Sequence, residues 1–192
     1  MTPEVHPLAD VEPGAVIGNG TRIWRFCHVM AGARIGRDCS FGQGCFVAAG
    51  AIVGDRVRVQ NHVSVYAGVV LEDDAFVGPS AVFTNVKNPR TAHPTRAYLQ
   101  TRVCRGATIG ANATILPGIR VGRWAFVGAG AVVTADLLDY ALVLGVPARQ
   151  VGWVSERGAR LDFDLEGRAT CPLGGEEYVL QDGSCGRSAP RL

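Results

Sequence analysis

An aliphatic or phenylalanine residue returns every six positions along most of this chain. The first run holds thirteen such positions without a gap: Val11, Ile17, Ile23, Val29, Ile35, Phe41, Val47, Val53, Val59, Val65, Leu71, Val77 and Phe83. After one interruption the pattern resumes at Val103, Ile109, Ile115, Val121, Val127 and Val133. A period of six is neither the 3.6-residue period of a helix nor the alternation of a strand. It predicts short strands joined by tight corners, with three hexads in each triangular coil.

A second small or β-branched residue follows most of these positions by four residues, and together the two positions fill the inside of the coil. Cys27, Cys39 and Cys45 occupy this second position, so we interpret them as packing residues and not as disulfide or metal ligands. The sequence therefore predicts an all-β parallel β-helix of about six coils. Because its interior is filled, the chemistry must lie on the outer surface.

The 192 residues are organised around this repeat. We expect residues 1–152 to form the β-helix domain, with residues 1–10 as a lead-in that covers the first coil. The register slips by fourteen residues after Phe83, which predicts one protruding loop at about 85–102. A loop that leaves a repeat array is a common place for function, and this one is too short to fold alone, so we expect it to lie against another subunit.

The last forty residues, 153–192, lose the repeat and show short strand patterns around glycine turns. We expect one or two hairpins that cap the end of the coil. Their spacing is similar to that of a zinc ribbon, but Ser155, Arg157 and Gly174 stand where three of the ligands would be. Cys171 alone cannot hold a tetrahedral zinc ion, so no metal is expected.

The charge and hydropathy pattern exclude several classes of partner. A net charge of +2 is too small to favour nucleic acid or an anionic membrane. The chain opens with no cationic segment followed by an apolar run, and no apolar stretch reaches about 18 residues. We therefore expect a cytoplasmic protein.

The hexad pattern [LIV]-[GAED]-x-x-[STAV]-x resembles that of the hexapeptide-repeat acyltransferases. This resemblance implies a left-handed parallel β-helix, a hand that periodicity alone does not give, because parallel crossovers are otherwise almost always right-handed. It also implies a homotrimer, with acyl-coenzyme A bound in the groove between adjacent subunits.

A more specific resemblance lies in six segments of the chain. They read GTRIWRFCHV (20–29), CSFGQGCFV (39–47), VQNHVSVYAGVVLEDDAFVGPSAVFTNVKNPR (59–90), GATIGANATI (106–115), FVGAGAVVTAD (126–136) and YALVLGVPARQVGW (140–153). They resemble the bacterial N-acetyltransferases that acetylate the 3-amino group of UDP-2-acetamido-3-amino-2,3-dideoxyglucuronic acid. That sugar is used in lipopolysaccharide O-antigen biosynthesis, and acetyl-CoA is the co-substrate.

Outward positions eighteen residues apart stack on the same edge of the coil. Gln43, Asn61 and Pro79 form one such column, and Gly44, His62 and Ser80 form the next. The resemblance implies that Gln43, Asn61, His62 and Tyr66 bind the nucleotide-sugar. A purely structural ladder of corner amides is the alternative for Gln43 and Asn61.

Asn85 lies where the chain leaves the coil, and the resemblance implies that it orients the substrate amine. The alternative is a turn asparagine bonded to its own backbone. A carboxylated sugar also calls for a nearby cation, and Lys87 and Arg90 are the candidates, unless both are solvated loop charges.

The later coils present small residues that allow the thin pantetheine arm of coenzyme A to approach backbone amides. The resemblance implies a cofactor groove formed by Pro79, Ser80, Gly110, Ala111, Ala129 and Gly130. Arg149 would meet a phosphate of the nucleotide end, or alternatively cap the last coil.

The sequence holds no convincing nucleophile–base constellation, which favours direct attack of the sugar amine on the thioester. Asp73 and Asp74 could act as acid and base, but a turn-supporting role at the corner is favoured. His28 and His62 face outward as candidate bases, His62 being the better placed.

Other functions stay open at this point. They include an acetyltransferase of another nucleotide-linked 3- or 4-amino-deoxysugar or of serine, a γ-type carbonic anhydrase, and a non-catalytic β-helix module. The carbonic anhydrase site uses a close histidine pair, which His6, His28, His62 and His93 do not form in the sequence.

Overall fold

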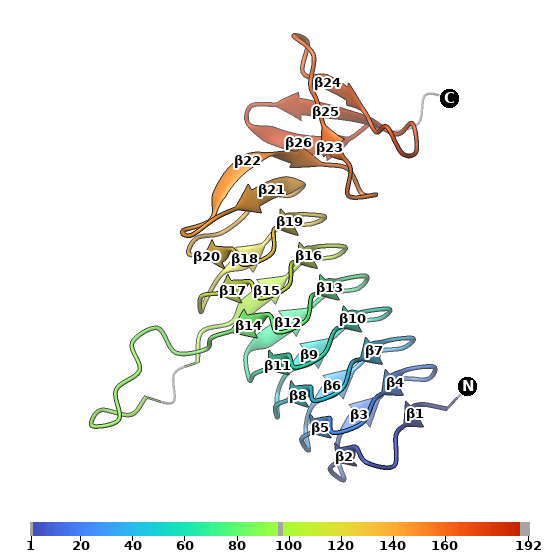
Figure 1. Cartoon of the computed structure of the whole chain (residues 1–192), viewed down its shortest axis with the longest axis vertical. Coiled ribbons are helices and arrows are strands. Elements are labelled where there is room, and N and C mark those ends of the chain that lie inside the picture. The colour runs from blue at the N-terminus through green and yellow to red at the C-terminus, as the bar shows by residue number, and fades with distance from the viewer. Residues whose placement is uncertain (1, 96–97, 189–192) are drawn as a thin grey trace.

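A computed structural model describes residues 2–95 and 98–188. In this part of the chain every regular element is a strand, and three parallel sheets wind around one axis (Figure 1). None of the described residues belongs to a helix long and apolar enough to cross a membrane. The all-β parallel β-helix that the hexads predict is confirmed.

Three parallel sheets form the sides of the coil, and a fourth, antiparallel sheet lies at its end. Sheet A consists of β1 (Glu4–Val5), β4 (Arg22–Ile23), β7 (Ser40–Phe41), β10 (Arg58–Val59), β13 (Phe76–Val77), β16 (Thr108–Ile109), β19 (Phe126–Val127), β21 (Ala141–Leu144), β22 (Arg149–Val154) and β23 (Arg160–Leu161). Sheet B consists of β2 (Asp10–Val11), β5 (His28–Val29), β8 (Phe46–Val47), β11 (Ser64–Val65), β14 (Val82–Phe83), β17 (Thr114–Ile115) and β20 (Val132–Val133). Sheet C consists of β3 (Val16–Ile17), β6 (Arg34–Ile35), β9 (Ile52–Val53), β12 (Val69–Leu71), β15 (Thr101–Val103) and β18 (Arg120–Val121). Sheet D consists of β24 (Arg168–Thr170), β25 (Glu177–Gln181) and β26 (Ser184–Arg187).

The register of the sheets follows the repeat. Phe41 lies opposite Val59, eighteen residues later, and Leu71 lies opposite Val103, thirty-two residues later because the fourteen-residue insertion intervenes. Each hexad supplies a strand of two residues, or three in β12 and β15, whose last side chain points inward. These inward side chains form one continuous core, in which Phe41, Val59 and Leu71 are at most 1% exposed. Cys27, Cys39 and Cys45 are buried in it as free thiols.

The corners need backbone that turns sharply. At the third corner residue after each sheet A strand from β4 to β19, φ is positive, as at His62 (59°), Ser80 (57°) and Asn112 (56°). Glycine takes this conformation without strain at Gly44 and Gly130, which accounts for many of the corner glycines.

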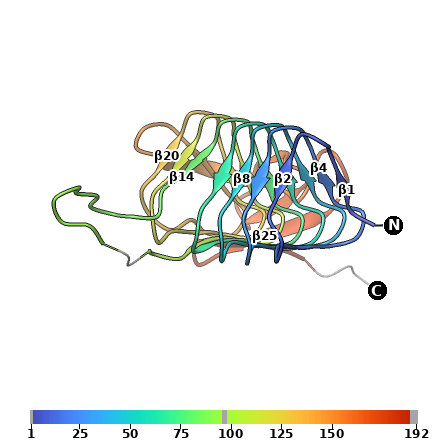
Figure 2. The ribbon, with the colours of Figure 1, turned by 90° about the horizontal axis from the view of Figure 1, so that it is seen from below.

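The ends and the insertion differ from the expectation in detail. The described part of the expected lead-in, residues 2–10, does not cover the first coil, because β1 pairs with β4 and is itself part of that coil; Val5 is 40% exposed there. The loop spans residues 84–100, since Thr101 and Arg102 belong to β15 and pair with β12. It projects far from the solenoid (Figure 2), and its residues 96 and 97 lie outside the described part.

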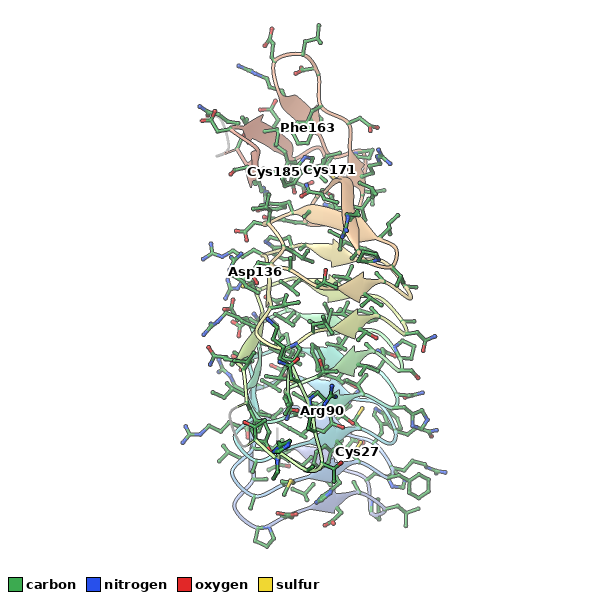
Figure 3. The ribbon with its side chains drawn as sticks, turned by 90° about the vertical axis from the view of Figure 1, so that its left-hand side faces the viewer. Cys27, Arg90, Asp136, Phe163, Cys171 and Cys185 are labelled. Carbon is green, nitrogen blue, oxygen red and sulfur yellow. The ribbon has the colours of Figure 1, made fainter. Side chains whose placement is uncertain are left out.

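The C-terminal residues form antiparallel hairpins, as expected. β21 turns back into β22, and β22 pairs with β23, while Cys171, Tyr178 and Cys185 of the β24–β26 region form a second small core (Figure 3). The domain division at 152/153 stays a prediction, and β22 runs continuously across it.

Candidate functional site

The three sheets meet at three corners, and these corners organise the outer surface. The corner that follows each sheet A strand from β4 to β19 and precedes the next sheet B strand is here called the A–B ridge. It consists of residues 24–26, 42–44, 60–62, 78–80, 110–112 and 128–130. Its six levels span about 24 Å at the usual strand spacing of about 4.8 Å.

Most residues proposed for the two ligands lie on this one ridge, in axial order. Gln43, Asn61 and His62 occupy its N-terminal half, all three exposed to solvent. The proposed cofactor residues follow toward the C-terminus: Pro79, Ser80, Gly110, Ala111, Ala129 and Gly130. The structure therefore brings a candidate sugar-nucleotide region and a candidate coenzyme A region onto one continuous edge.

Arg149 lies at the C-terminal end of the same ridge. β21 continues sheet A above β19, with Val143 opposite Val127, so the turn after Leu144 lies over the Gly128–Gly130 corner. The backbone N–H of Ala148 donates to the carbonyl of Val132 at 2.8 Å and fixes this turn. Arg149 itself is exposed, and one of its guanidinium nitrogens donates to the carbonyl of Ala148 at 2.9 Å.

A different corner carries Asn85, Tyr66, Lys87 and Arg90. Tyr66 and Asn85 lie between sheets B and C, and Asn85 begins the projecting loop. The carbonyl of Asn85 accepts the backbone N–H of Leu99 at 3.2 Å, which closes the base of the loop. Among the described residues, the side-chain amide of Asn85 forms no hydrogen bond and Lys87 and Arg90 form no ion pair. Arg90 lies on the side from which the loop projects (Figure 3).

The free backbone N–H groups distinguish the A–B ridge from the corner between sheets C and A. At the C–A corner, carboxylates accept the N–H of the second corner residue: Asp55 binds Arg37 at 2.8 Å, Asp73 binds Asp55 at 3.0 Å and Asp139 binds Arg123 at 2.9 Å. On the A–B ridge, the N–H groups of Ala111 and Ala129 have no partner among the described residues. A polar N–H left open beside a small side chain is ready to bind an external carbonyl.

The side chain of Asn61 has one polar group that bonds to the neighbouring coil and one that has no partner in the described structure. Its side-chain oxygen accepts the backbone N–H of Gln43 at 3.0 Å, so the corner ladder considered from the sequence exists. Gly42 makes room for it, because a Cβ on Gly42 would lie 2.2 Å from that oxygen. The bond orients the Asn61 amide and leaves its NH₂ group without a partner in the described structure.

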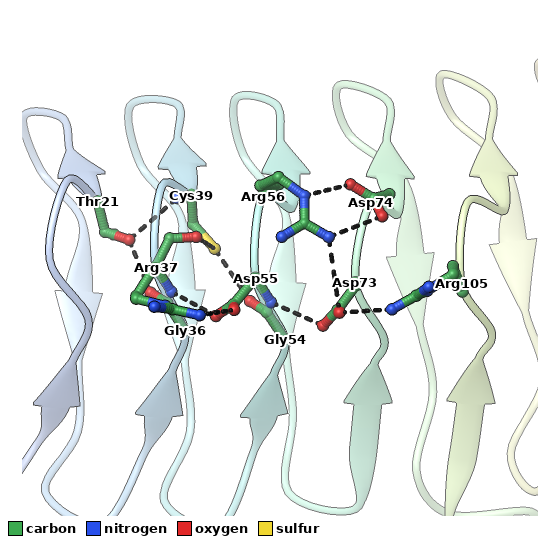
Figure 4. A network of polar contacts seen from close by, with 10 residues as sticks. All are labelled: Thr21, Gly36, Arg37, Cys39, Gly54, Asp55, Arg56, Asp73, Asp74 and Arg105. Atoms are coloured by element: carbon green, nitrogen blue, oxygen red, sulfur yellow. Dashed lines mark hydrogen bonds and ion pairs between the residues drawn. The ribbon is translucent and has the colours of Figure 1, made fainter.

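Asp73 and Asp74 have the structural role that the sequence favoured. They join a ladder of ion pairs along the C–A corner (Figure 4), with Asp73 2.9 Å from Arg105 and Asp74 2.7 Å from Arg56. The N–H of Asp55 and the Arg105 guanidinium lower the pKa of the Asp73 carboxyl. Both aspartates therefore form ion pairs with arginines of neighbouring coils.

One polar pair was missed in the sequence. His28 was read as an outward histidine without a partner, but its Nε2 lies 2.8 Å from Glu12 Oε1 and 3.9 Å from Asp10 Oδ2. The N–H of Ala31 and the His28 ring lower the pKa of Glu12. The sixteen-residue separation of Glu12 and His28 places them on adjacent coils, and that spacing was the available signal. His62 is exposed, and its ring lies over Gly44.

Residues of the C-terminal segment that has the zinc-ribbon spacing bond to other protein side chains. The thiol of Cys171 donates to Ser155 Oγ at 3.1 Å, and Arg157 Nε lies 2.7 Å from Glu176 Oε1. Across residues 2–95 and 98–188, no group of three or more His, Cys, Asp or Glu side chains is arranged to hold a metal ion.

Comparison with known proteins agrees with this fold. Residues 14–49 and 100–135 match the bacterial transferase hexapeptide (six repeats) family, and residues 32–67 match the hexapeptide repeat of succinyl-transferase. The acetyltransferase domain of PglB from Neisseria gonorrhoeae, in complex with acetyl coenzyme A, is similar at 26% identity and a TM-score of 0.53. That similarity covers 78% of this chain and 58% of the solved chain.

A perosamine N-acetyltransferase variant from Caulobacter crescentus, in complex with CoA and GDP-perosamine, is similar at 25% identity and a TM-score of 0.51, over 79% of this chain and 57% of that one. The chain thus spans a little over half the length of these solved proteins. The dTDP-3-amino-3,6-dideoxy-alpha-D-galactopyranose 3-N-acetyltransferase of Aneurinibacillus thermoaerophilus is 42% identical over 179 residues, which cover 93% of this chain and 92% of the relative. Through this near full-length similarity and its matched repeats, the chain belongs to the hexapeptide-repeat acyltransferase family, with the left-handed β-helix that the resemblance implied.

Proposed function

We propose that this protein is an acetyl-CoA-dependent N-acetyltransferase that acetylates the 3-amino group of a nucleotide-linked amino sugar. The observation that carries the proposal is the pair of open N–H groups at Ala111 and Ala129 on the ridge, where the C–A corner has carboxylates instead. The two peptide-like groups of pantetheine can bind such a row of amides. The similarity to a 3-N-acetyltransferase over nearly the whole chain supports the same chemistry.

The reaction we propose is direct transfer. The neutral sugar amine attacks the thioester carbonyl and forms the amide C–N bond, the C–S bond breaks as the tetrahedral intermediate collapses, and an amine proton passes to the departing coenzyme A thiolate. Asn85 accepts a hydrogen bond from the amine through its side-chain oxygen and directs the lone pair, while ridge N–H groups stabilise the oxyanion. No covalent enzyme intermediate is required.

The placement of Asn85 supports a site shared between subunits of a homotrimer. Asn85 lies on the B–C corner with Tyr66, whereas most of the proposed ligand residues lie on the A–B ridge across sheet B. From Pro79 to Asn85 the chain runs six residues, at most about 20 Å at 3.3 Å per residue. A neighbouring copy that inserts its loop beside the ridge would bring the two corners together.

The acceptor we propose is UDP-2-acetamido-3-amino-2,3-dideoxyglucuronic acid, as used for O-antigen in the cytoplasm. Lys87 and Arg90, exposed and without ion pairs in the described structure, are the proposed partners of its carboxylate. The 42% identical relative is named for a 6-deoxy sugar on dTDP, which has no such carboxylate. That sugar is therefore the second candidate acceptor.

The experiment measures thiol release from acetyl-CoA with three acceptors: the uronate, its 3-amino-glucose analogue, and dTDP-3-amino-3,6-dideoxygalactose. Turnover with the uronate alone, with a higher KM in Lys87→Gln, supports the acidic sugar. Faster turnover with the dTDP sugar replaces it by the second candidate. No release with any acceptor contradicts the proposed activity, provided that acetyl-CoA is intact at the end of the assay.

A further inference from the structure

One corner of the A–B ridge differs from the others and has no role in the reaction described above. Residues Trp24, Arg25 and Phe26 occupy its first level, whereas the other levels carry small or amide side chains and one imidazole, that of His62. Trp24 is 51% exposed and Phe26 is 62% exposed. Large exposed aromatic side chains at the N-terminal end of the ridge indicate a place where a ligand can bind.

The backbone at this corner is held by hydrogen bonds to both adjacent coils. Phe26 adopts φ of 60°, a conformation that is uncommon for a bulky residue and that glycine adopts at the equivalent Gly44. Its N–H donates to the carbonyl of Leu8 at 2.9 Å, and the carbonyl of Arg25 accepts the N–H of Gly44 at 3.1 Å. These bonds to the coils below and above fix the backbone from which the exposed side chains project, in the same positive-φ turn that His62, Ser80 and Asn112 adopt at their corners.

A hollow of about 450 Å³ adjoins this corner. Its described lining combines Trp24 and Arg25 with the amide side chains of Gln43, Gln60 and Asn61, and it includes no carboxylate. The neighbouring hollow along sheet A differs, because Glu4 and Asp38 line it beside Arg22 and Arg58 and its described lining holds no aromatic ring. The first hollow thus offers an aromatic ring, a cation and amide donors and acceptors together.

We propose that this hollow binds the nucleoside diphosphate end of the substrate, with the base on Trp24, its edge at the amides, and the diphosphate at Arg25. An aromatic face stacks on any base, and the guanidinium suits a phosphate. The order of the residues along the ridge agrees with this assignment. The nucleoside would lie at the levels of Trp24 and Gln43, the sugar at Asn61 and His62, and coenzyme A at Ala111 and Ala129. The inference rests on the proposed function for its substrate class, but it concerns nucleotide binding and not transfer.

The test uses the full chain and measures binding of UDP, dTDP and uridine by calorimetry, without an amino sugar. Trp24→Ala should weaken binding of all three about tenfold or more. Arg25→Ala should weaken binding of UDP and dTDP while leaving uridine within twofold. Trp124→Ala and Arg123→Ala, at the C–A corner, are the matched controls and should bind all three like the wild type.

Several outcomes overturn the inference. They are absence of UDP and dTDP binding by the wild type, unchanged binding by Trp24→Ala, or equal loss of uridine and UDP in Arg25→Ala. If Trp24→Ala fails to fold, Gln43→Glu replaces it, because a carboxylate on this exposed side chain should repel the diphosphate without affecting the core. Gln43→Glu binding UDP like the wild type would also refute the proposal.

The same variants separate this inference from the proposed function. Nucleotide binding that depends on Trp24, with no acetyl transfer to any acceptor, supports the hollow and contradicts the transferase. Acetyl transfer with the KM for the sugar nucleotide unchanged in Trp24→Ala supports the transferase and contradicts the hollow.

Discussion

Two replacements of Asn61 separate its structural role from its proposed role in binding. The side-chain oxygen of Asn61 accepts the N–H of Gln43 at 3.0 Å, and its NH₂ group has no partner among the described residues. Asn61→Asp keeps an oxygen in the first position and places a second, negatively charged oxygen where the NH₂ group was. Asn61→Ala removes both groups.

The structure sets the expected cost of each change. At the C–A corner, Asp55 and Asp73 already make the same bond to the preceding coil at 2.8 and 3.0 Å, so aspartate is compatible with this geometry. Asn61→Asp should therefore leave the free energy of unfolding nearly unchanged. In Asn61→Ala, Gln43 is exposed and water can reach its N–H, so the loss is that of one net hydrogen bond, about 1 kcal/mol. For a chain of this length that corresponds to a fall in Tm of about 2–4 °C.

Substrate binding should respond in the opposite order. Loss of an amide donor and gain of a carboxylate beside a nucleotide sugar should raise its KM about tenfold or more in Asn61→Asp. Thermal unfolding and steady-state kinetics on the two variants decide the matter. A melting temperature of Asn61→Asp below that of Asn61→Ala, or wild-type KM in Asn61→Asp, would refute the reasoning.

Three further predictions follow from the same geometry. Asn85→Ala should lower kcat about 100-fold with Tm unchanged, because one oriented hydrogen bond to the reacting group is lost; unchanged kcat removes Asn85 from the mechanism. Ala129→Pro should raise the KM for acetyl-CoA about fivefold without unfolding the corner, since Pro79 already follows a glycine at the equivalent place, and kinetics with varied acetyl-CoA test it. The pKa values of Glu12, Asp55 and Asp73 are lowered in the folded state, so the stability that these carboxylates contribute is present above their ordinary values near pH 4 and is lost as the pH falls through the lowered ones. Chemical unfolding between pH 5 and about pH 2 measures this, and stability that stays level over that range contradicts the carboxylate ladder.

The repeat determined the fold because a coil with a filled interior accepts few residue types at its inward positions and corners. Each inward position must be apolar and each corner must turn within four residues, so a period of six specifies both the strand and its partner eighteen residues later. Phe41 and Val59 could be paired from the sequence for this reason. The end of the loop could not be fixed to the residue, because Thr101 and Arg102 are strand residues whose side chains follow no apolar pattern.

The candidate site was only partly accessible to such reasoning. The eighteen-residue period stacked Gln43, Asn61 and Pro79 correctly, since the spacing alone fixes a column. It could not show that Asn61 holds the N–H of Gln43 while the amides of Ala111 and Ala129 stay open, because hydrogen-bond pairing depends on side-chain directions at each corner. The Glu12–His28 pair was missed for the same reason.

Sequence alone thus determined the coil, its register and the outward columns, because these follow from the periodic burial of apolar side chains. Only the tertiary structure decided which side chains and backbone groups each corner presents. It placed Asn85 and the loop across sheet B from the ridge, closed the C–A corner with carboxylates, and left the ridge amides and the Trp24 hollow open. Those features depend on contacts between coils eighteen residues apart and on the turn of the chain at each corner, and no local sequence pattern encodes either.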